Sequence, residues 1–164
     1  MDSSHIDEHP RFRRLADYLA NKAPPGKLPG RQHIEPTEIP DLLPWIMMID
    51  VITKPGAEPR YRIRLVGTEV VAIQGSDATG KYVTDVLNKD DVASILQNYG
   101  EIVRSGQPGY RRGIVATTGR EHVRYRRIAF PLARDGEHVD VLMFVFVNDG
   151  NGRSPPKPRD TTVT

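Results

Sequence analysis

The sequence predicts one α+β domain, a five-stranded antiparallel sheet with helices gathered on one face and an amphipathic helix at the N-terminus. Five segments have the apolar runs or the alternating pattern of strands. Turn-like residues join all consecutive strands except the second and the third, which form the central pair in chain order. A long amphipathic helical pattern separates that central pair. The length of 164 residues and the 38% hydrophobic fraction fit a single domain.

The N-terminal segment has the spacing of a helix with one apolar side. Phe12, Leu15 and Leu19 recur at intervals of three and four, which predicts a helix over Arg11–Asn21. Ala23–Gly30 is rich in proline and glycine and predicts a linker. The three apolar side chains are therefore expected to cap a sheet face, in the same chain or in a dimer partner.

Two strands follow the linker. Trp45–Ile52 is a nearly continuous apolar run, which predicts a strand covered on both faces. Tyr61, Ile63 and Leu65 alternate with arginines, which predicts a half-buried neighbour. Short helical turns are predicted before and after this pair, at Glu35–Leu43 and Thr68–Ile73.

The clearest helix is predicted at Lys89–Ser105, with Asn88 as its N-cap and Gly106 as its end. Three further strands are predicted at Tyr110–Thr117, His122–Pro131 and His138–Val147. Their boundaries give three parts: residues 1–30 with the first helix and linker, 31–148 as the main domain, and 149–164 as a disordered tail.

Turn placement sets the partners of the arginines in these strands. A two-residue turn at Gly119 and Arg120 would place Arg112 opposite Arg127, and a tight turn after Arg134 would place Arg127 opposite Phe144. Like charges facing each other destabilise a sheet unless an anion lies between them. Arg112 and Arg127 are therefore candidates for anion binding; the alternatives are an acidic side chain of this chain or a solvated, charged sheet edge.

The order of elements resembles that of the PAS domain, and several segments resemble one bacterial PAS subfamily. These segments are Ile34–Pro44, Ile49–Val51, Arg60–Thr68, Asp77–Lys81 and Arg127–Leu132. The likeness extends from about Arg11 to Val147. It implies a signalling or ligand-sensing module, often dimeric and without catalysis of its own. It implies no particular ligand, because PAS domains use haem, flavin, carboxylates, lipids or nothing.

Several kinds of chemistry are disfavoured. The chain has no cysteine, which rules out disulfides, thiolate metal sites and a cysteinyl-flavin adduct. Haem-binding PAS domains usually take an axial histidine from the region that corresponds to Asp77–Ser105, where this chain has none. No histidine pair has zinc-ligand spacing, and no motif of a nucleophile elbow or phosphate loop is present. We therefore expect no metal and no enzymatic activity, and we leave the cofactor unknown.

The leading hypothesis is a cytoplasmic PAS-type sensor or adaptor that binds a small ligand, forms a homodimer and contacts an unidentified signalling protein. The candidate cleft residues are Trp45, Met47, Ile63, Leu65, Tyr82, Ile95, Tyr99, Tyr125, Leu142 and Phe144. The rival is a ligand-free interaction or dimerisation module with a fully packed core. Nucleic-acid binding through the arginine-rich hairpins is third, because Trp45, Tyr82 and Tyr99 are not interleaved with these arginines as stacking platforms. The longest apolar runs are too short to cross a membrane.

Overall fold

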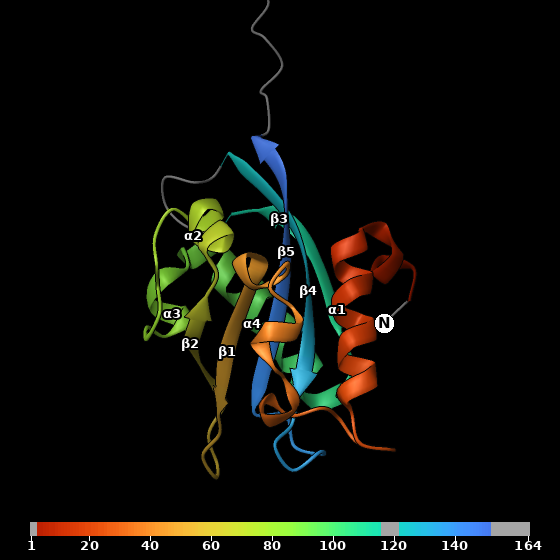
Figure 1. Ribbon diagram of the computed structural model, residues 1–164. Helices are drawn as coiled ribbons and strands as arrows, with labels where there is room; N and C mark the ends of the chain where they lie inside the picture. Colours follow the sequence, from red (N-terminus) through yellow and green to blue (C-terminus); the bar gives the residue numbers. More distant parts are fainter. Residues whose placement is uncertain (1–2, 116–121, 152–164) are drawn as a thin grey trace, which may run out of the picture.

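The computed structural model describes residues 3–115 and 122–151 (Figure 1). Its helices are the α-helices α1 (Pro10–Lys22), α2 (Thr68–Gln74), α3 (Val83–Val86) and α4 (Lys89–Ser105), and the 3₁₀ helices η1 (Ser3–Glu8), η2 (Arg31–His33), η3 (Pro36–Glu38) and η4 (Leu43–Trp45). Its strands are β1 (Ile46–Ile52), β2 (Arg60–Val66), β3 (Gly109–Ile114), β4 (Val123–Leu132) and β5 (Val141–Asn151).

The five strands form one sheet in the order β2-β1-β5-β4-β3, and every neighbouring pair is antiparallel. The predicted α+β fold and its five-stranded antiparallel sheet are confirmed. The chain leaves the sheet after β2, forms α2, α3 and α4, and returns at the opposite edge as β3. β5, the last strand, therefore lies at the centre.

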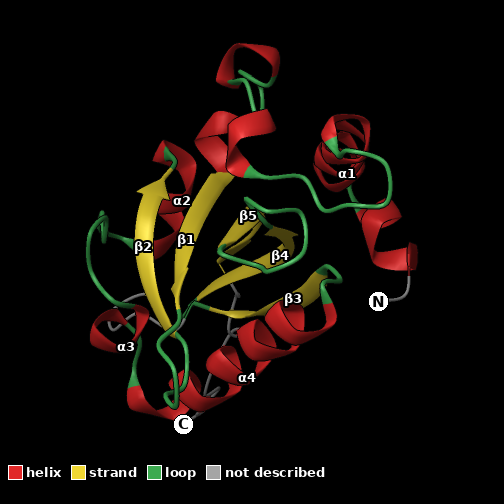
Figure 2. Ribbon diagram, turned by 90° about the horizontal axis from the view of Figure 1, so that it is seen from below, coloured by secondary structure: helices red, strands yellow, loops and turns green. Residues whose placement is uncertain are grey.

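Both faces of the sheet are covered (Figure 2), with α3 and α4 on one side and α1 on the other. Leu142 and Phe144 of β5 belong to the core beneath α2, α3 and α4, whereas Met143 and Val145 belong to the core beneath α1. All four side chains are 0% exposed. This burial explains the continuous apolar run in β5, since a strand covered on both faces has no polar alternation.

The apolar side of α1 packs against the sheet in the same chain. Phe12, Leu15 and Leu19 are at most 4% exposed and share a core with Ile128 and Val145. The helix begins after His9, whose imidazole Nδ1 accepts a hydrogen bond from the Arg11 backbone N–H at 3.1 Å. The N-terminal helix thus supplies the cover that the second face of the sheet requires.

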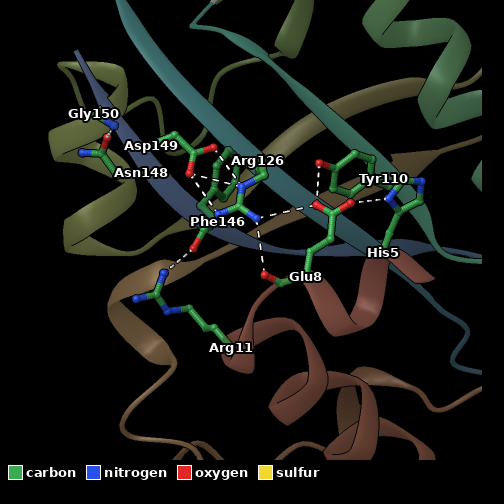
Figure 3. Close-up of polar contacts among 9 residues, drawn as sticks. All are labelled: His5, Glu8, Arg11, Tyr110, Arg126, Phe146, Asn148, Asp149 and Gly150. Carbon is green, nitrogen blue, oxygen red and sulfur yellow. Dashed lines mark hydrogen bonds and ion pairs between the residues drawn. The ribbon is translucent and has the colours of Figure 1, made fainter. Parts of the chain in front are cut away.

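A polar docking network also holds this N-terminal segment to the sheet (Figure 3). The Tyr110 hydroxyl of β3 donates to the Glu8 carboxylate at 2.8 Å, and His5 stacks on the Tyr110 ring at 3.9 Å. Arg126 of β4 reaches Glu8 Oε2 at 3.6 Å and donates from Nε and Nη2 to Asp149 of β5 at 2.9 and 3.0 Å. One arginine therefore connects η1 to two strands.

Arg11 makes the second attachment. Its Nη1 donates to the Phe146 carbonyl oxygen at 2.8 Å (Figure 3). Its guanidinium carbon lies 3.7 Å from the centre of the Trp45 ring. α1 is consequently tied to β5 and to the start of β1.

The long helix has the bounds that the sequence predicts. Asn88 Oδ1 accepts a hydrogen bond from the Asp91 backbone N–H at 3.1 Å, which caps α4. Gly106 ends the helix with φ 65°, in the left-handed region that favours glycine.

The predicted register of β3 against β4 is wrong by one residue. Arg112 pairs with Arg126, and the partner of Arg127 is Arg111. Because successive side chains of a strand point to opposite faces, the difference reverses the predicted faces of β3. Arg112 and Arg127 therefore lie on opposite faces and cannot share an anion. The predicted turn at Gly119 and Arg120 lies outside the described residues.

The register of β4 against β5 differs from the predicted one by two residues. An even offset leaves each side chain on its predicted face of the sheet. Arg127 lies opposite Phe146, two positions beyond the predicted Phe144. The connection over residues 133–140 is longer than a tight hairpin: Asp135 accepts hydrogen bonds from the backbone N–H groups of Glu137 and His138 at 2.8 and 2.7 Å. β5 also extends through Asn151, so residues 149–151, which were predicted to belong to the tail, are part of the sheet; residues 152–164 lie outside the described part.

Candidate functional site

The cleft between the sheet and α2–α4 contains two adjoining chambers. The first, about 50 Å³, is named the arginine chamber and is lined by Met47, Ile73, Gln74, Leu87, Ile95, Tyr99, Val115, Tyr125, Arg127 and Phe146. The second, about 220 Å³, is named the loop chamber and is lined by Met47, Ile49, Ile63, Gln74, Ser76, Ala78, Lys81, Val83, Asp85, Val86, Leu87 and Tyr99.

Four residues line both chambers: Met47, Gln74, Leu87 and Tyr99. The Gln74 amide Nε2 lies 3.8 Å from the Met47 sulfur, a weak acceptor. Neither chamber alone reaches about 300 Å³, the lower size of typical ligand pockets. A rotation of Gln74 and the flexible Met47 would change the wall that the chambers share.

Five of the ten predicted cleft residues line these chambers: Met47, Ile63, Ile95, Tyr99 and Tyr125. Leu142 and Phe144 belong to the same core but line neither chamber. Phe144 lies behind Tyr99, with the two ring centres 5.3 Å apart.

The other three predicted cleft residues lie elsewhere. A register shift between Met48 and Ile49 places Leu65 opposite Met48, on the α1 side of the sheet, where it is 45% exposed. Trp45 lies at the start of β1 beneath Arg11. Tyr82 lies beside β2, and its ring centre is 3.7 Å from the Arg60 guanidinium carbon. The strict alternation assumed for β2 fails at the bulge.

Arg127 is unusual among the residues of the arginine chamber because it is a charged side chain that is buried. It is 3% exposed, and its Nη2 donates to Asn98 Oδ1 at 2.7 Å while Nη1 lies 3.5 Å from the Gly109 carbonyl oxygen. Its guanidinium carbon lies 5.6 Å from the Tyr99 ring centre and 5.0 Å from that of Phe144. Within the described residues no carboxylate lies within 4 Å of its nitrogens.

Arg111 lies directly across from Arg127 on the neighbouring strand. Its Nε donates to the Tyr125 hydroxyl at 3.3 Å, and its Nη2 donates to the Ser94 hydroxyl at 3.2 Å. Burial lowers the pKa of the Arg127 guanidinium, and the charge of Arg111 lowers it further. The Arg127 guanidinium still stays charged at neutral pH, because the guanidinium group is among the strongest bases in proteins.

Tyr99 separates this charged end of the cleft from the loop chamber. Burial raises the pKa of its hydroxyl to about 12. The phenol is therefore neutral at physiological pH and can donate a hydrogen bond to a ligand. Its ring also packs edge-on against Tyr61, with the two ring centres 5.2 Å apart.

Sequence reasoning missed several lining residues. Phe146 follows Leu142 and Phe144 at the strand period of two, which predicts its face, but it was not among the predicted cleft residues. Arg111 lines neither chamber, but as the cross-strand neighbour of Arg127 it was missed because of the register difference described above. Ser76, Ala78 and Lys81 come from an irregular segment whose position no periodicity specifies.

Two properties of the described residues bear on function. Over residues 3–115 and 122–151, no helix combines the length and apolarity needed to cross a bilayer. The same ranges hold no group of three or more histidine, aspartate or glutamate side chains that could bind a metal ion.

The family model of the PAS domain matches residues 7–145. The chain belongs to the PAS-domain family. This match includes α1 as well as the sheet and the helices of the cleft, and it confirms the resemblance noted in the sequence. No curated protein matches the chain.

Two solved LOV structures share the fold, and a PAS-B structure gives a lower score. The LOV protein of Rhodobacter sphaeroides superposes with a TM-score of 0.50 at 10% identity, over 84% of this chain and 68% of that one. The RsLOV D109G variant gives the same TM-score at 12% identity, over 68% and 62% of the two chains. The W398A variant of the PAS-B domain of Drosophila melanogaster Cycle, with bound glycerol, superposes with a TM-score of 0.48 at 6% identity, over 63% of this chain and 97% of that one. At these identities the likeness shows the fold alone.

Proposed function

We propose that this PAS domain is a non-catalytic sensor in which a small ligand occupies the cleft and alters the contacts of α1 with a signalling protein. The observation that carries the proposal is the pair of adjoining chambers on one face of strands whose other face holds α1. Ligand sites typically combine apolar walls with a few polar groups, and this cleft has both.

A short path connects the cleft to the N-terminal helix. The Phe146 side chain lines the arginine chamber, while its backbone carbonyl accepts the hydrogen bond from Arg11. Arg127 lines the same chamber, while its neighbour Arg126 belongs to the docking network. A shift of β4 or β5 on ligand binding would therefore act on the contacts that hold η1 and α1.

The homodimer expected from the sequence is part of this proposal. The α1 side of the sheet keeps a groove of about 520 Å³ over β1 and β2, where Leu43 and Leu65 are 36% and 45% exposed. Its lining carries both signs of charge, including Arg31 and Asp140. A surface of this composition can be complementary to itself across a two-fold axis.

The sensor hypothesis is tested by filling the loop chamber. Ala78 is 5% exposed and lines it, so Ala78→Phe should exclude a ligand. Ala57→Phe, at an exposed alanine between β1 and β2, is the matched control. Native mass spectrometry of the purified full chain should find a retained small molecule in the wild type and in the control but not in Ala78→Phe.

Two results would decide against this function. Ala78→Phe that retains the same molecule would place the binding site elsewhere. A wild type without any retained molecule, together with an increased Tm for Ala78→Phe, would favour the ligand-free interaction module, because filling an empty cavity stabilises a protein.

A further inference from the structure

The charge at the end of the cleft indicates the class of ligand. Arg127 is buried with a permanent positive charge, and its hydrogen-bond partners are the neutral oxygens of Asn98 and Gly109. A buried ion without a countercharge is unfavourable, because the protein interior replaces its hydration poorly. Arg127 is therefore a group whose environment an anion would improve.

The cross-strand neighbour strengthens this argument. Arg111 faces the same side of the sheet and is also bonded only to neutral oxygens, those of Ser94 and Tyr125, within the described residues. Like charges opposite each other destabilise a sheet. Arg127 in the chamber and Arg111 beside it thus make this end of the cleft positive, and no acidic side chain is among the residues that line the arginine chamber in the described part of the chain.

The shape and polarity of the cleft restrict the anion further. The arginine chamber is small, about 50 Å³, and the guanidinium group is planar with two donors that match the two oxygens of a carboxylate. Tyr99 and Tyr125 also line this chamber, and their hydroxyl groups are hydrogen-bond donors. Beyond Met47 and Leu87 the loop chamber has room for an organic body, with Ile63 and Val83 among its apolar walls.

We propose that the cleft binds a small organic acid, with its carboxylate at Arg127 in the arginine chamber and its apolar body in the loop chamber. This inference rests on the proposed sensor function and gives its ligand a chemical class. Gln74 lines both chambers, and among the described residues its amide Nε2 donates to the weak acceptor Met47. It can turn to give the carboxylate a further hydrogen bond.

The test compares acids with their uncharged counterparts on the full-length chain. Isothermal titration with benzoate and hexanoate should show binding, whereas benzamide and hexanamide should bind at least about 10-fold more weakly, since a charge-assisted contact adds about one decade or more. This comparison needs no variant. Equal affinities of the acids and amides would overturn the carboxylate assignment, and so would a lack of binding by all four.

A variant pair locates the carboxylate. Arg127→Met keeps most of the side-chain volume and removes the charge, so it should weaken acid binding about 10- to 100-fold without lowering the Tm of the free protein. Arg124→Met, at an exposed arginine of the same strand, should bind as the wild type does. If Arg127→Met does not fold, Arg127→Gln replaces it. Unchanged acid binding in a folded Arg127 variant would overturn the proposal.

The two proposals fail in different ways. A neutral molecule that is retained by the wild type and lost in Ala78→Phe would leave the sensor function in place and refute the acid. An empty wild-type cleft with an increased Tm for Ala78→Phe would refute both.

Discussion

Arg126 and Arg127 are adjacent in β4, and their environments show how one strand serves two sites. Arg127 is buried beneath α4 with neutral partners, whereas Arg126 on the opposite face forms ion pairs with Glu8 and Asp149. The alternation of side chains along a strand is enough to separate the two roles. Each of the two has the partners of its own face, and of the two it is Arg127 that has no countercharge in the described part of the chain.

His9 makes the docking of α1 sensitive to pH. Its Nδ1 must be unprotonated to accept the hydrogen bond from the Arg11 backbone N–H. Burial is the main cause that lowers the pKa of His9; the charges of Arg11 and Arg126 lower it further, and the charge of Asp149 raises it. Below about pH 6.5 the unfolded chain binds a proton that the folded chain excludes. The contribution of His9 to stability is therefore complete above pH 6.5 and is lost as the pH falls.

We expect His9→Asn to lose less Tm than the wild type between pH 7.5 and pH 5, because asparagine keeps the capping acceptor and does not titrate. His138→Asn is a control of opposite sign: Asp135 raises the pKa of His138, so His138 stabilises the fold at acidic pH. The His138→Asn variant should therefore lose more Tm than the wild type between pH 7.5 and pH 5. Parallel Tm profiles of the wild type and His9→Asn would contradict the role of His9.

α1 contributes to stability as a cover for one sheet face. Leu15 is 0% exposed against that face, so Leu15→Asp buries an unpaired charge and removes apolar contacts. We expect a loss of about 3–5 kcal/mol in the free energy of unfolding. At about 2–4 °C per kcal/mol for a chain of this size, the Tm should fall by roughly 6–20 °C.

Ala20→Asp, at an exposed position of the same helix, should cost about 1 kcal/mol or less. Thermal and urea unfolding of both variants, with sedimentation at the same concentrations, measures the effect. A Leu15→Asp variant that keeps the wild-type Tm and only changes its association state would show that α1 covers a partner instead of its own sheet.

The elements were predictable where the pattern is local. The apolar stripe and the caps of α4 gave its bounds, and the continuous apolar run of β5 required cover on both faces. The faces that were predicted wrongly result from offsets of one residue, whereas the two-residue offset of β5 kept its faces. The β3–β4 register and the bulge that moves Leu65 depend on pairing across the sheet, where one extra residue reverses a face. A cross-strand arginine pair is therefore present, but with Arg111 in the place of the predicted Arg112, and anion binding by the pair stays a prediction.

In the molecule as a whole, helices cover the two faces of the sheet to different extents. α2, α3 and α4 cover the first around the cleft, whereas α1 covers the second mainly over β4 and β5 and leaves the groove over β1 and β2. Leu65 lies in this groove because of the bulge. The open part adjoins the strands that carry the cleft, which suits an interface whose contacts respond to a ligand.

We expect the chain to form a homodimer through this groove and Leu65→Glu to dissociate it. Leu65 is already 45% exposed in the monomer, so the added charge should leave the Tm of the monomer within about 1–2 °C, as for other surface changes. At the dimer interface the same charge would be desolvated opposite its own copy, which is unfavourable. Ile114→Glu, at a 52% exposed residue on the opposite edge strand, is the control. Sedimentation velocity over a 100-fold concentration range should show dimers for the wild type and Ile114→Glu and monomers for Leu65→Glu; a monomeric wild type, or a dimeric Leu65→Glu, would refute this interface.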